Sequence, residues 1–292
     1  MTIGELLKEY RISQGKNQKK FINDGMIVSQ SYYSKVEKNA NKITVDNLVD
    51  LLHYNNIPIW EFFSRLNSND DLRHQQIKDF NNMMIEAYYE NNIDKVRGLK
   101  PLVKESNLSN KDKEEELLLV EAWLEAMKDP SEEPDLQLRT KIKEKIFNIP
   151  NFNDTKVALF CNFMPFYDLE SNIVIAKKIT DQYINTKNTK MQVALLAIIT
   201  NILSFSLNEN KEKNVDYFIE SGEKIKTKPE LVFYSSAFYF FKNIIFYHRT
   251  NSDEYYNKSI QTKNFLLSIG MTEYGKLRDR IILCVRMNSS LK

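Results

Sequence analysis

Apolar residues recur every three or four positions along most of this chain, which is the spacing of amphipathic α-helices. Over residues 1–66 the apolar runs are short and are separated by tight turns, so they predict five short helices. Over residues 67–292 the runs are longer and rich in aromatic residues. They predict eleven helices, near residues 71–91, 93–106, 111–128, 135–148, 154–168, 171–186, 189–207, 211–226, 230–249, 252–268 and 272–288.

The two parts predict an all-α fold with two domains, residues 1–66 and residues 67–292. A polar run at residues 67–71 divides them and is interpreted either as a linker or as the N-cap of the next helix. In the second part, short polar turns between helices favour a TPR-like α-solenoid of about five helix pairs followed by a C-terminal helix.

A repeated sequence supports the solenoid. Residues 159–166, 198–205 and 240–247 resemble one another, and each segment places an asparagine inside an apolar stretch. These residues, Asn162, Asn201 and Asn243, are 39 and 42 positions apart. A period of roughly 34 to 47 residues is typical of helical-hairpin repeats.

Composition agrees with a helical, intracellular protein. The 292 residues include 7 Gly and 7 Pro, well below the roughly 12% of average usage, and sheet-rich folds need both residues for their turns. The two cysteines, Cys161 and Cys284, lie in apolar stretches and are expected to be buried, reduced thiols. The N-terminus lacks the apolar segment of a signal peptide. The apolar stretch 193–207 is short for a membrane span, so we expect it to be a core helix of a cytoplasmic protein.

Charge is distributed unevenly. The whole chain has a formal net charge of +2, whereas residues 1–42 hold eight Lys and Arg residues against four Asp and Glu residues, a net charge of +4. Lysines that contact phosphate supply most of the sequence-independent affinity for DNA. The alternative for such a cluster is that it only improves solubility.

Within the five-helix pattern, residues 18–37 have the lengths of a helix, a turn and a second helix that enters the major groove. The first turn of that second helix would meet base edges, where the Gln30 amide can pair with adenine N6 and N7. The helix that begins after Asn17 would meet phosphate through its free backbone N–H groups. The alternative is an ordinary solvated helix face. The candidates for DNA contact are Asn17, Gln18, Lys19, Ser29, Gln30, Ser31, Tyr32, Ser34, Lys35, Lys38, Asn41 and Lys42.

A buried ion pair is also expected. Arg11 ends the first predicted helix and Glu37 ends the third, and in this arrangement the two side chains would meet and hold the groove-facing helix against its scaffold. The expected role is structural. Breaking such a pair leaves an unmatched buried charge, which costs about 3–5 kcal/mol of folding stability.

Several stretches carry a family resemblance. Residues 3–11 (IGELLKEYR), 17–21 (NQKKF) and 28–38 (VSQSYYSKVEK) resemble the Cro/C1-type (XRE) helix-turn-helix, and residues 43–48 (ITVDNL) and 57–62 (IPIWEF) resemble the Rgg/GadR/MutR regulators in particular. Arg11 and Glu37 match that family's structural pair, and Gln18 matches its phosphate-contacting glutamine. Asn39 and Asn55 stand where the family often has Gly and Leu. Some members join their DNA-binding domains through a cysteine near position 45, where this chain has Val45.

The resemblance implies a cytoplasmic, homodimeric transcription factor whose helical-repeat domain binds a short imported signalling peptide, as in quorum sensing. The family belongs to a wider group of receptors for imported peptides, which hold the peptide backbone with asparagines. In a solenoid, the first helix of each pair lines the concave side. The alternative is that the asparagines bond neighbouring helices and the aromatic residues form core. The candidates for the peptide site are Asn162, Asn201, Asn243, Phe163, Phe166, Phe205, Tyr239, Phe240, Phe246 and Tyr247. The candidates for binding a peptide carboxylate, each with a solvated face as the alternative, are Arg249, Arg278, Arg280 and Arg286.

The sequence offers no signature of catalysis. It has no HExxH, GxSxG or P-loop motif, and its three histidines are scattered without metal-ligand spacing. We therefore expect no catalytic residue, no metal site, no cofactor and no enzymatic activity. Two other functions stay open: a ligand-independent or phage-type repressor, and a helical-repeat protein-interaction scaffold with a docking module.

Overall fold

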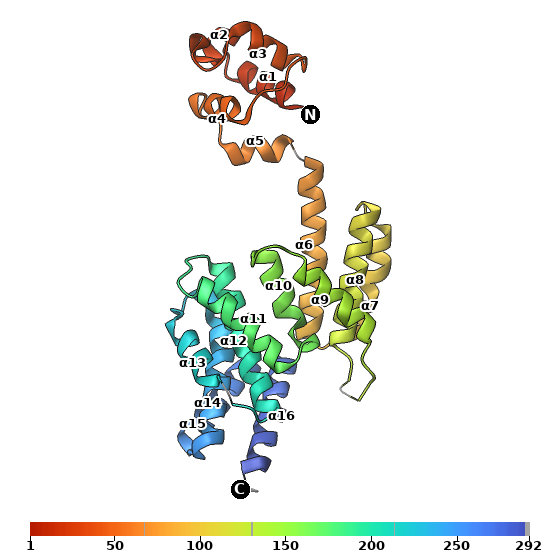
Figure 1. The fold of residues 1–292 in the computed structure, drawn as a ribbon, viewed down its shortest axis with the longest axis vertical. Coiled ribbons are helices and arrows are strands. Elements are labelled where there is room, and N and C mark those ends of the chain that lie inside the picture. Colours follow the sequence, from red (N-terminus) through yellow and green to blue (C-terminus); the bar gives the residue numbers. More distant parts are fainter. Residues whose placement is uncertain (67, 130, 213, 290–292) are drawn as a thin grey trace. The chain divides into compact units, whose positions relative to one another are not determined.

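The computed structural model describes all residues except 67, 130, 213 and 290–292, and it describes residues 68–71, 284 and 286–289 by their backbone alone (Figure 1). Over this part of the chain every regular element is a helix, which confirms the predicted all-α fold. The chain forms two compact units, Met1–Asn81 and Asn82–Lys292. The division falls inside one continuous helix, α6 (Ser68–Tyr89), later than the boundary expected from the polar run at 67–71. Residue 67 and the side chains of that run lie outside the described residues, as does the side chain of Cys284.

The first unit contains the predicted five helices. Their apolar faces form one core around Leu6, Tyr33, Leu51 and Phe62. Side chains cap the helix starts, since the side-chain oxygens of Thr2, Asn17, Ser29 and Thr44 accept hydrogen bonds from backbone N–H groups. The helices are α1 (Ile3–Ser13), α2 (Gln18–Phe21), α3 (Gln30–Glu37), α4 (Val45–Tyr54) and α5 (Ile59–Leu66), with a 3₁₀ turn η1 (Asn23–Gly25) after α2.

Helices α1 and α3 cross at very close range. A Cβ atom built on Gly4 would lie 2.0 Å from the carbonyl oxygen of Val36, well inside the contact distance of a carbon and an oxygen. Only glycine permits this approach, so Gly4 fixes the position of α3 on the scaffold.

The second unit consists of helix pairs that stack along the chain (Figure 1). The first helices of the pairs are the end of α6, α8, α10, α12 and α14, and α16 follows the last pair. The prediction of about five pairs plus a C-terminal helix is confirmed. The helices after α6 are α7 (Ile93–Glu105), α8 (Asn110–Ala126), α9 (Leu136–Phe147), α10 (Asp154–Phe163), α11 (Leu169–Tyr183), α12 (Thr189–Asn208), α13 (Val215–Lys224), α14 (Val232–Thr250), α15 (Asp253–Ser268) and α16 (Thr272–Ser289).

A few predicted helix ends differ from the structure. The predicted helix 154–168 stops at Phe163 and continues as the 3₁₀ turn η2 (Met164–Phe166), because Pro165 cannot donate a helical hydrogen bond. In the first unit, α2 stops at Phe21, and Asn23 and Asp24 after it take positive φ angles. A third 3₁₀ turn, η3 (Pro229–Leu231), precedes α14.

Helix α12 is the core helix of the second unit. By length and composition it is apolar enough to cross a membrane, but it packs against α10, α11, α13 and α14, and residues such as Leu195, Ile199 and Leu203 are fully buried. The expectation that residues 193–207 form a core helix is therefore confirmed.

Asparagine replaces glycine at many helix ends. Among the described residues, positive φ angles outside glycine occur at Asp24 and at seven asparagines. Asparagine tolerates this left-handed conformation better than most residues because its short amide can bond locally. The chain therefore ends its helices sharply although it contains few glycines. The asparagines are Asn23, Asn39, Asn56, Asn91, Asn210, Asn214 and Asn251.

Candidate functional site

Helix α3 presents a polar face to solvent. Its buried face consists of Tyr33, Val36 and Glu37, which pack into the core of the first unit. The rest of its surface carries exposed Gln30, Ser31, Lys35 and Lys38 and half-buried Ser34. This arrangement gives the first turn of α3 free side chains that can meet base edges, with lysines beside them.

Besides Gln18, three of the predicted DNA-contacting side chains make hydrogen bonds within the unit. The Oγ atom of Ser29 accepts the N–H of Tyr32 at 3.3 Å, and the hydroxyl of Tyr32 donates to the carbonyl of Lys42 at 2.7 Å. The Oδ1 atom of Asn17 accepts the N–H of Lys20 at 2.9 Å. These bonds fix the starts of α2 and α3, while the side chains of Lys19, Asn41 and Lys42 are exposed.

Arg11 and Glu37 form the ion pair that the sequence predicts. The Nε atom of Arg11 lies 2.5 Å from Oε1 of Glu37, and Nη2 lies 3.0 Å from Oε2. The pair is largely buried, with 14% and 4% of the two side chains exposed. A two-point contact of this kind fixes orientation as well as distance, so α3 is held to the end of α1.

Gln18 joins this pair. Its Nε2 atom donates to Oε2 of Glu37 at 2.8 Å, so the amide expected to contact phosphate also supports the ion pair. Burial alone would raise the pKa of Glu37, but the hydrogen bonds from Arg11 and Gln18 outweigh it and hold that pKa below its usual value. Glu37 is therefore charged at neutral pH and fully bonded.

Two departures from the family pattern have structural explanations. Asn39 follows α3 with a φ angle of 57°, the conformation that the glycine of the family allows. Asn55 is 2% exposed, and its Nδ2 atom donates to the carbonyls of Phe21 and Leu51, each at 2.8 Å. Its Oδ1 atom accepts from Lys16 at 2.8 Å. Asn55 thus ties the end of α2 to α4, a role that the sequence analysis did not foresee.

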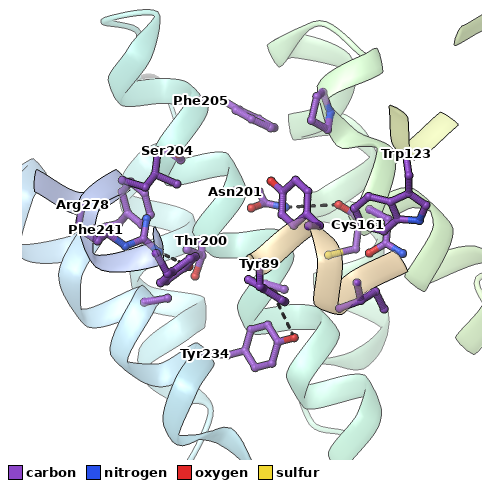
Figure 2. Close-up of a pocket in the computed structure, with 18 residues that line it drawn as sticks. Tyr89, Trp123, Cys161, Thr200, Asn201, Ser204, Phe205, Tyr234, Phe241 and Arg278 are labelled. Atoms are coloured by element: carbon purple, nitrogen blue, oxygen red, sulfur yellow. Dashed lines mark hydrogen bonds between the residues drawn. The ribbon is translucent and has the colours of Figure 1, made fainter. Parts of the chain in front are cut away.

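The second unit contains a pocket of about 210 Å³. Its described lining comes from the first helices (α6, α8, α10, α12 and α14), from the C-terminal helix α16 and from η2, so the pocket lies on the face where those helices meet (Figure 2). The spacing is helical, as on α12, where every lining residue is three, four, seven or eight positions after Ala197. The lining residues are Ile85, Tyr88, Tyr89, Trp123, Cys161, Asn162, Pro165, Ala197, Thr200, Asn201, Ser204, Phe205, Tyr234, Ala237, Phe241, Tyr274, Leu277 and Arg278.

Three of the predicted peptide-site residues meet at this pocket: Asn162, Asn201 and Phe205. The Nδ2 atom of Asn201 points to the carbonyl of Cys161 at 3.4 Å, a long hydrogen bond (Figure 2). The Cys161 thiol is also in the lining, and burial raises its pKa to about 12. It is therefore an inert, protonated thiol at neutral pH.

The third asparagine lies elsewhere. Asn243 is 1% exposed, and its Nδ2 atom donates to the carbonyl of Tyr239 in its own helix at 2.7 Å. Helix α14 faces the pocket with Ala237 and Phe241 instead. Since a helix turns by about 100° per residue, Asn243 points roughly 200° away from Phe241.

The other predicted aromatic residues are also outside the pocket lining. Phe163 and Phe240 are fully buried core residues. Phe166 stacks on Phe163, and Tyr239 is 40% exposed. Phe246 and Tyr247 pack against rings of α15. These residues share apolar stretches with the asparagines but lie on other faces of their helices.

The aromatic walls of the pocket come mainly from residues that the sequence analysis missed. Tyr88 lies 5.1 Å from Trp123 and 5.8 Å from Tyr89, ring centre to ring centre. Tyr89 then contacts the Tyr274 ring at 5.8 Å, and its hydroxyl lies 3.5 Å from that of Tyr234. The spacing of Ile85, Tyr88 and Tyr89 is typical of one helix face, but it does not indicate what that face contacts.

The four candidate arginines differ in their surroundings. Arg249 is bonded to Glu212 at 2.5 Å and to Asp216 at 2.6 Å. Arg280 is exposed, and the side chain of Arg286 lies outside the described residues. Arg278 is 2% exposed and lines the pocket.

A helix-turn-helix with an exposed polar recognition helix, followed by helical repeats, defines a class of DNA-binding transcriptional regulators. Comparison with family models makes this specific. The model described as the C-terminal domain of the HTH-type transcriptional regulator Rgg matches residues 99–273, and a helix-turn-helix model matches residues 7–62. The chain belongs to the Rgg family of transcriptional regulators, and it is not an enzyme.

Solved structures share the fold at low identity. The SHP pheromone receptor Rgg2 of Streptococcus dysgalactiae is 16% identical with a TM-score of 0.64, over 97% of this chain and 99% of that one. ComR of S. thermophilus, solved with DNA and its signalling peptide ComS, is 15% identical with a TM-score of 0.62, over 99% and 100%. The PrgX/iCF10 complex is 15% identical with a TM-score of 0.56, over 99% and 97%. A comparison with curated proteins finds no match.

Proposed function

We propose that this chain is a cytoplasmic, homodimeric, sequence-specific DNA-binding regulator controlled by a short imported signalling peptide, as in quorum sensing. The observation that carries the proposal is the pocket where residues of five first helices and of the C-terminal helix α16 meet, among them two asparagines of the predicted clamp. Similar solved structures support it, since ComR was solved with DNA and its signalling peptide and Rgg2 is a pheromone receptor.

In the DNA-binding part, α3 lies in the major groove. Gln30 and Ser31 contact base edges, and Lys35, Lys38 and Lys42 neutralise phosphates on either side. In a homodimer each module reads one half-site, and the half-sites are about one helical turn apart.

In the peptide-binding part, Asn162 and Asn201 bond the peptide backbone. Each amide provides an N–H donor and a carbonyl acceptor, which matches an extended chain whatever its side chains. The rings of Tyr88, Trp123 and Phe205 take up apolar side chains of the peptide. Binding then shifts the repeat domain between two shapes, which changes how the DNA-binding modules are presented.

The DNA-binding proposal is tested by selecting operator duplexes from a random library with the full-length protein. Gln30→Ala should weaken the selected site by roughly five- to one-hundred-fold and relax the preference for adenine. Lys35→Ala should weaken binding to all duplexes alike. It should also reduce the slope of log affinity against log salt concentration by about one, because one phosphate contact is lost. Lys187→Ala, at an exposed position of the repeat domain, is the control and should change nothing.

If Gln30→Ala and Lys35→Ala leave affinity and salt dependence untouched, α3 does not read DNA. Failure of the full-length protein to select any duplex would favour the alternative of a protein-interaction scaffold.

The peptide-binding proposal is tested with a pool of synthetic apolar octapeptides. Peptides retained by the protein are identified by mass spectrometry and then added to the DNA-binding assay. Asn201→Ala should retain at least tenfold less peptide and lose the response. Asn243→Ala is the matched control, because that amide bonds its own helix. Equal retention by wild type and Asn201→Ala would contradict the clamp, and a regulator that retains no peptide would be ligand-independent.

A further inference from the structure

Arg278 is a buried cation without an anion. It belongs to α16 and lines the pocket with 2% of its surface exposed (Figure 2). Its Nη2 atom donates to the Tyr274 hydroxyl, but its Nε atom is buried and has no hydrogen-bond partner among the described residues. In the described part of the chain, no carboxylate pairs with this guanidinium.

Three aromatic rings partly compensate the charge. The guanidinium carbon lies 4.2 Å from the ring centre of Tyr274, 4.4 Å from that of Phe241 and 4.9 Å from that of Phe240. Ring faces attract a cation, but they do not satisfy the N–H donors in the guanidinium plane. Burial accordingly lowers the pKa of Arg278, although an arginine stays protonated at any physiological pH.

A second unsatisfied group faces the same pocket. The Oγ1 atom of Thr200, on α12, is buried and has no hydrogen-bond partner among the described residues. Buried polar atoms are nearly always bonded, so two unpaired groups in one pocket indicate a missing partner that accepts hydrogen bonds. Arg249 shows the alternative within this chain, since two carboxylates satisfy its charge.

We propose that Arg278 and Thr200 form an anion subsite that binds a carboxylate of the ligand. A guanidinium fork matches the two oxygens of a carboxylate, and the Thr200 hydroxyl supplies another donor. Because the surrounding walls are aromatic, the carboxylate enters attached to an apolar group. The inference rests on the proposed peptide pocket and adds the charge that the ligand must carry. The carboxylate is either the C-terminus of the peptide or the side chain of an aspartate or glutamate.

The chain offers a local reporter for this test. It contains two tryptophans: Trp123 lines the pocket, and Trp60 is 75% exposed in the DNA-binding domain. In the full-length Trp60→Phe protein, Trp123 fluorescence therefore reports on the pocket alone. Three probes are titrated: N-acetyl-leucine, with a terminal carboxylate; N-acetyl-leucinamide, with none; and N-acetyl-aspartyl-leucinamide, with a side-chain carboxylate only.

We expect N-acetyl-leucine to change Trp123 emission saturably and to bind at least tenfold more tightly than its amide. Tighter binding of the aspartyl probe than of N-acetyl-leucine would assign the subsite to an acidic side chain, and the reverse order to a C-terminus. Arg278→Met should abolish the difference between acid and amide, and Arg278→Lys should keep part of it. Thr200→Val should weaken the acid alone. Arg280→Met, an exposed arginine on the same helix, is the matched control and should bind like wild type.

Equal binding of acid and amide to the wild-type pocket would overturn the anion subsite and leave the peptide pocket standing. Absence of binding by all three probes would overturn it too, and the octapeptide selection would then decide the peptide pocket separately. If Arg278→Met does not fold, Arg278→Lys and Thr200→Val carry the comparison, and an unchanged ratio of acid to amide in both would contradict the inference.

Discussion

The two domains treat buried charge in opposite ways. In the DNA-binding domain, Glu37 is buried against Arg11 and Gln18, and both carboxylate oxygens are bonded. In the repeat domain, Arg278 is buried without a carboxylate, and Glu116 on α8 is 4% exposed with its Oε2 atom unbonded among the described residues. A paired buried charge holds a structure in place, whereas an unpaired one is costly unless something else completes it.

This difference in buried charge corresponds to the part of each domain that the proposed function uses. The DNA-binding domain acts through its outer surface, so its interior is closed by the ion pair and by the tight crossing at Gly4. Under the proposed function the repeat domain acts through its interior, where a pocket lies among six helices. In the proposal, a ligand satisfies groups such as Arg278 and Thr200, and this explains why they are tolerated.

The largest expected effect comes from breaking the closed interior. Arg11→Met leaves the Glu37 carboxylate buried without its cation, so the DNA-binding domain should lose about 3–5 kcal/mol of stability. Hydrogen exchange of the α1 and α3 amides in the full-length protein measures this loss. Amides of α12 in the same sample are the internal control and should keep their protection. A loss below about 1 kcal/mol would show that the pair does not hold α3.

A slightly smaller loss is expected from Gly4→Ala. The new Cβ atom would lie 2.0 Å from the carbonyl oxygen of Val36, so α1 and α3 must separate, at a cost of about 1–3 kcal/mol. DNA affinity should fall together with the protection of the α3 amides. Unchanged affinity would mean that the crossing of α1 and α3 adjusts without disturbing the recognition helix.

An intermediate effect distinguishes the two buried carboxyls by pH. Burial raises the pKa of Glu116 to about 7, with the Lys145 charge opposing this shift and Glu115 and Asp112 adding to it. Because the folded-state pKa is raised, the stability that depends on protonated Glu116 is complete below about pH 4.5 and is lost as the pH rises through about 7. Glu37 has the opposite sign, since its pKa is lowered and its contribution is lost as the pH falls.

Glu116→Gln should therefore stabilise the repeat domain at pH 8, by an amount on the order of 2 kcal/mol, and flatten its pH dependence between pH 5 and 8. Hydrogen exchange of the α8 amides across this range is the measurement. Glu114→Gln, at an exposed position of the same helix, is the control. A stability profile of Glu116→Gln parallel to that of wild type would show that Glu116 does not titrate there.

The sequence predicted most of the fold because helix period, capping residues and turn asparagines are local signals. The Arg11–Glu37 pair also followed from it, since the helix-turn-helix arrangement fixes which helix ends meet. The pocket was predicted only in part. Asn162 and Asn201 lie on equivalent helix faces, but Asn243 is two positions beyond the pocket-facing Phe241. A repeat of variable length does not fix the rotation of each helix.

Other parts of the pocket depend on tertiary packing alone. Tyr88 and Tyr89 belong to α6, which precedes the repeated segments, so no internal comparison points to them. Arg278 was one of four candidate arginines, and its sequence neighbours do not distinguish it from exposed Arg280. Its burial arises because α16 closes against the rings of α14, and that contact joins residues far apart in the chain.

The smallest expected effect comes from a glycine of the repeat domain that contrasts with Gly4. Gly98 lies in the middle of α7, as Gly4 lies in α1, but a Cβ atom at Gly98 would meet nothing within 4 Å. Gly98→Ala should therefore stabilise the repeat domain by about 0.5–1 kcal/mol, because alanine loses less conformational entropy in a helix. The sign of the stability change is measured by thermal unfolding and by hydrogen exchange of the α7 amides. A loss of stability would mean that the surroundings of Gly98 are not open in solution, so the contrast with Gly4 would not hold.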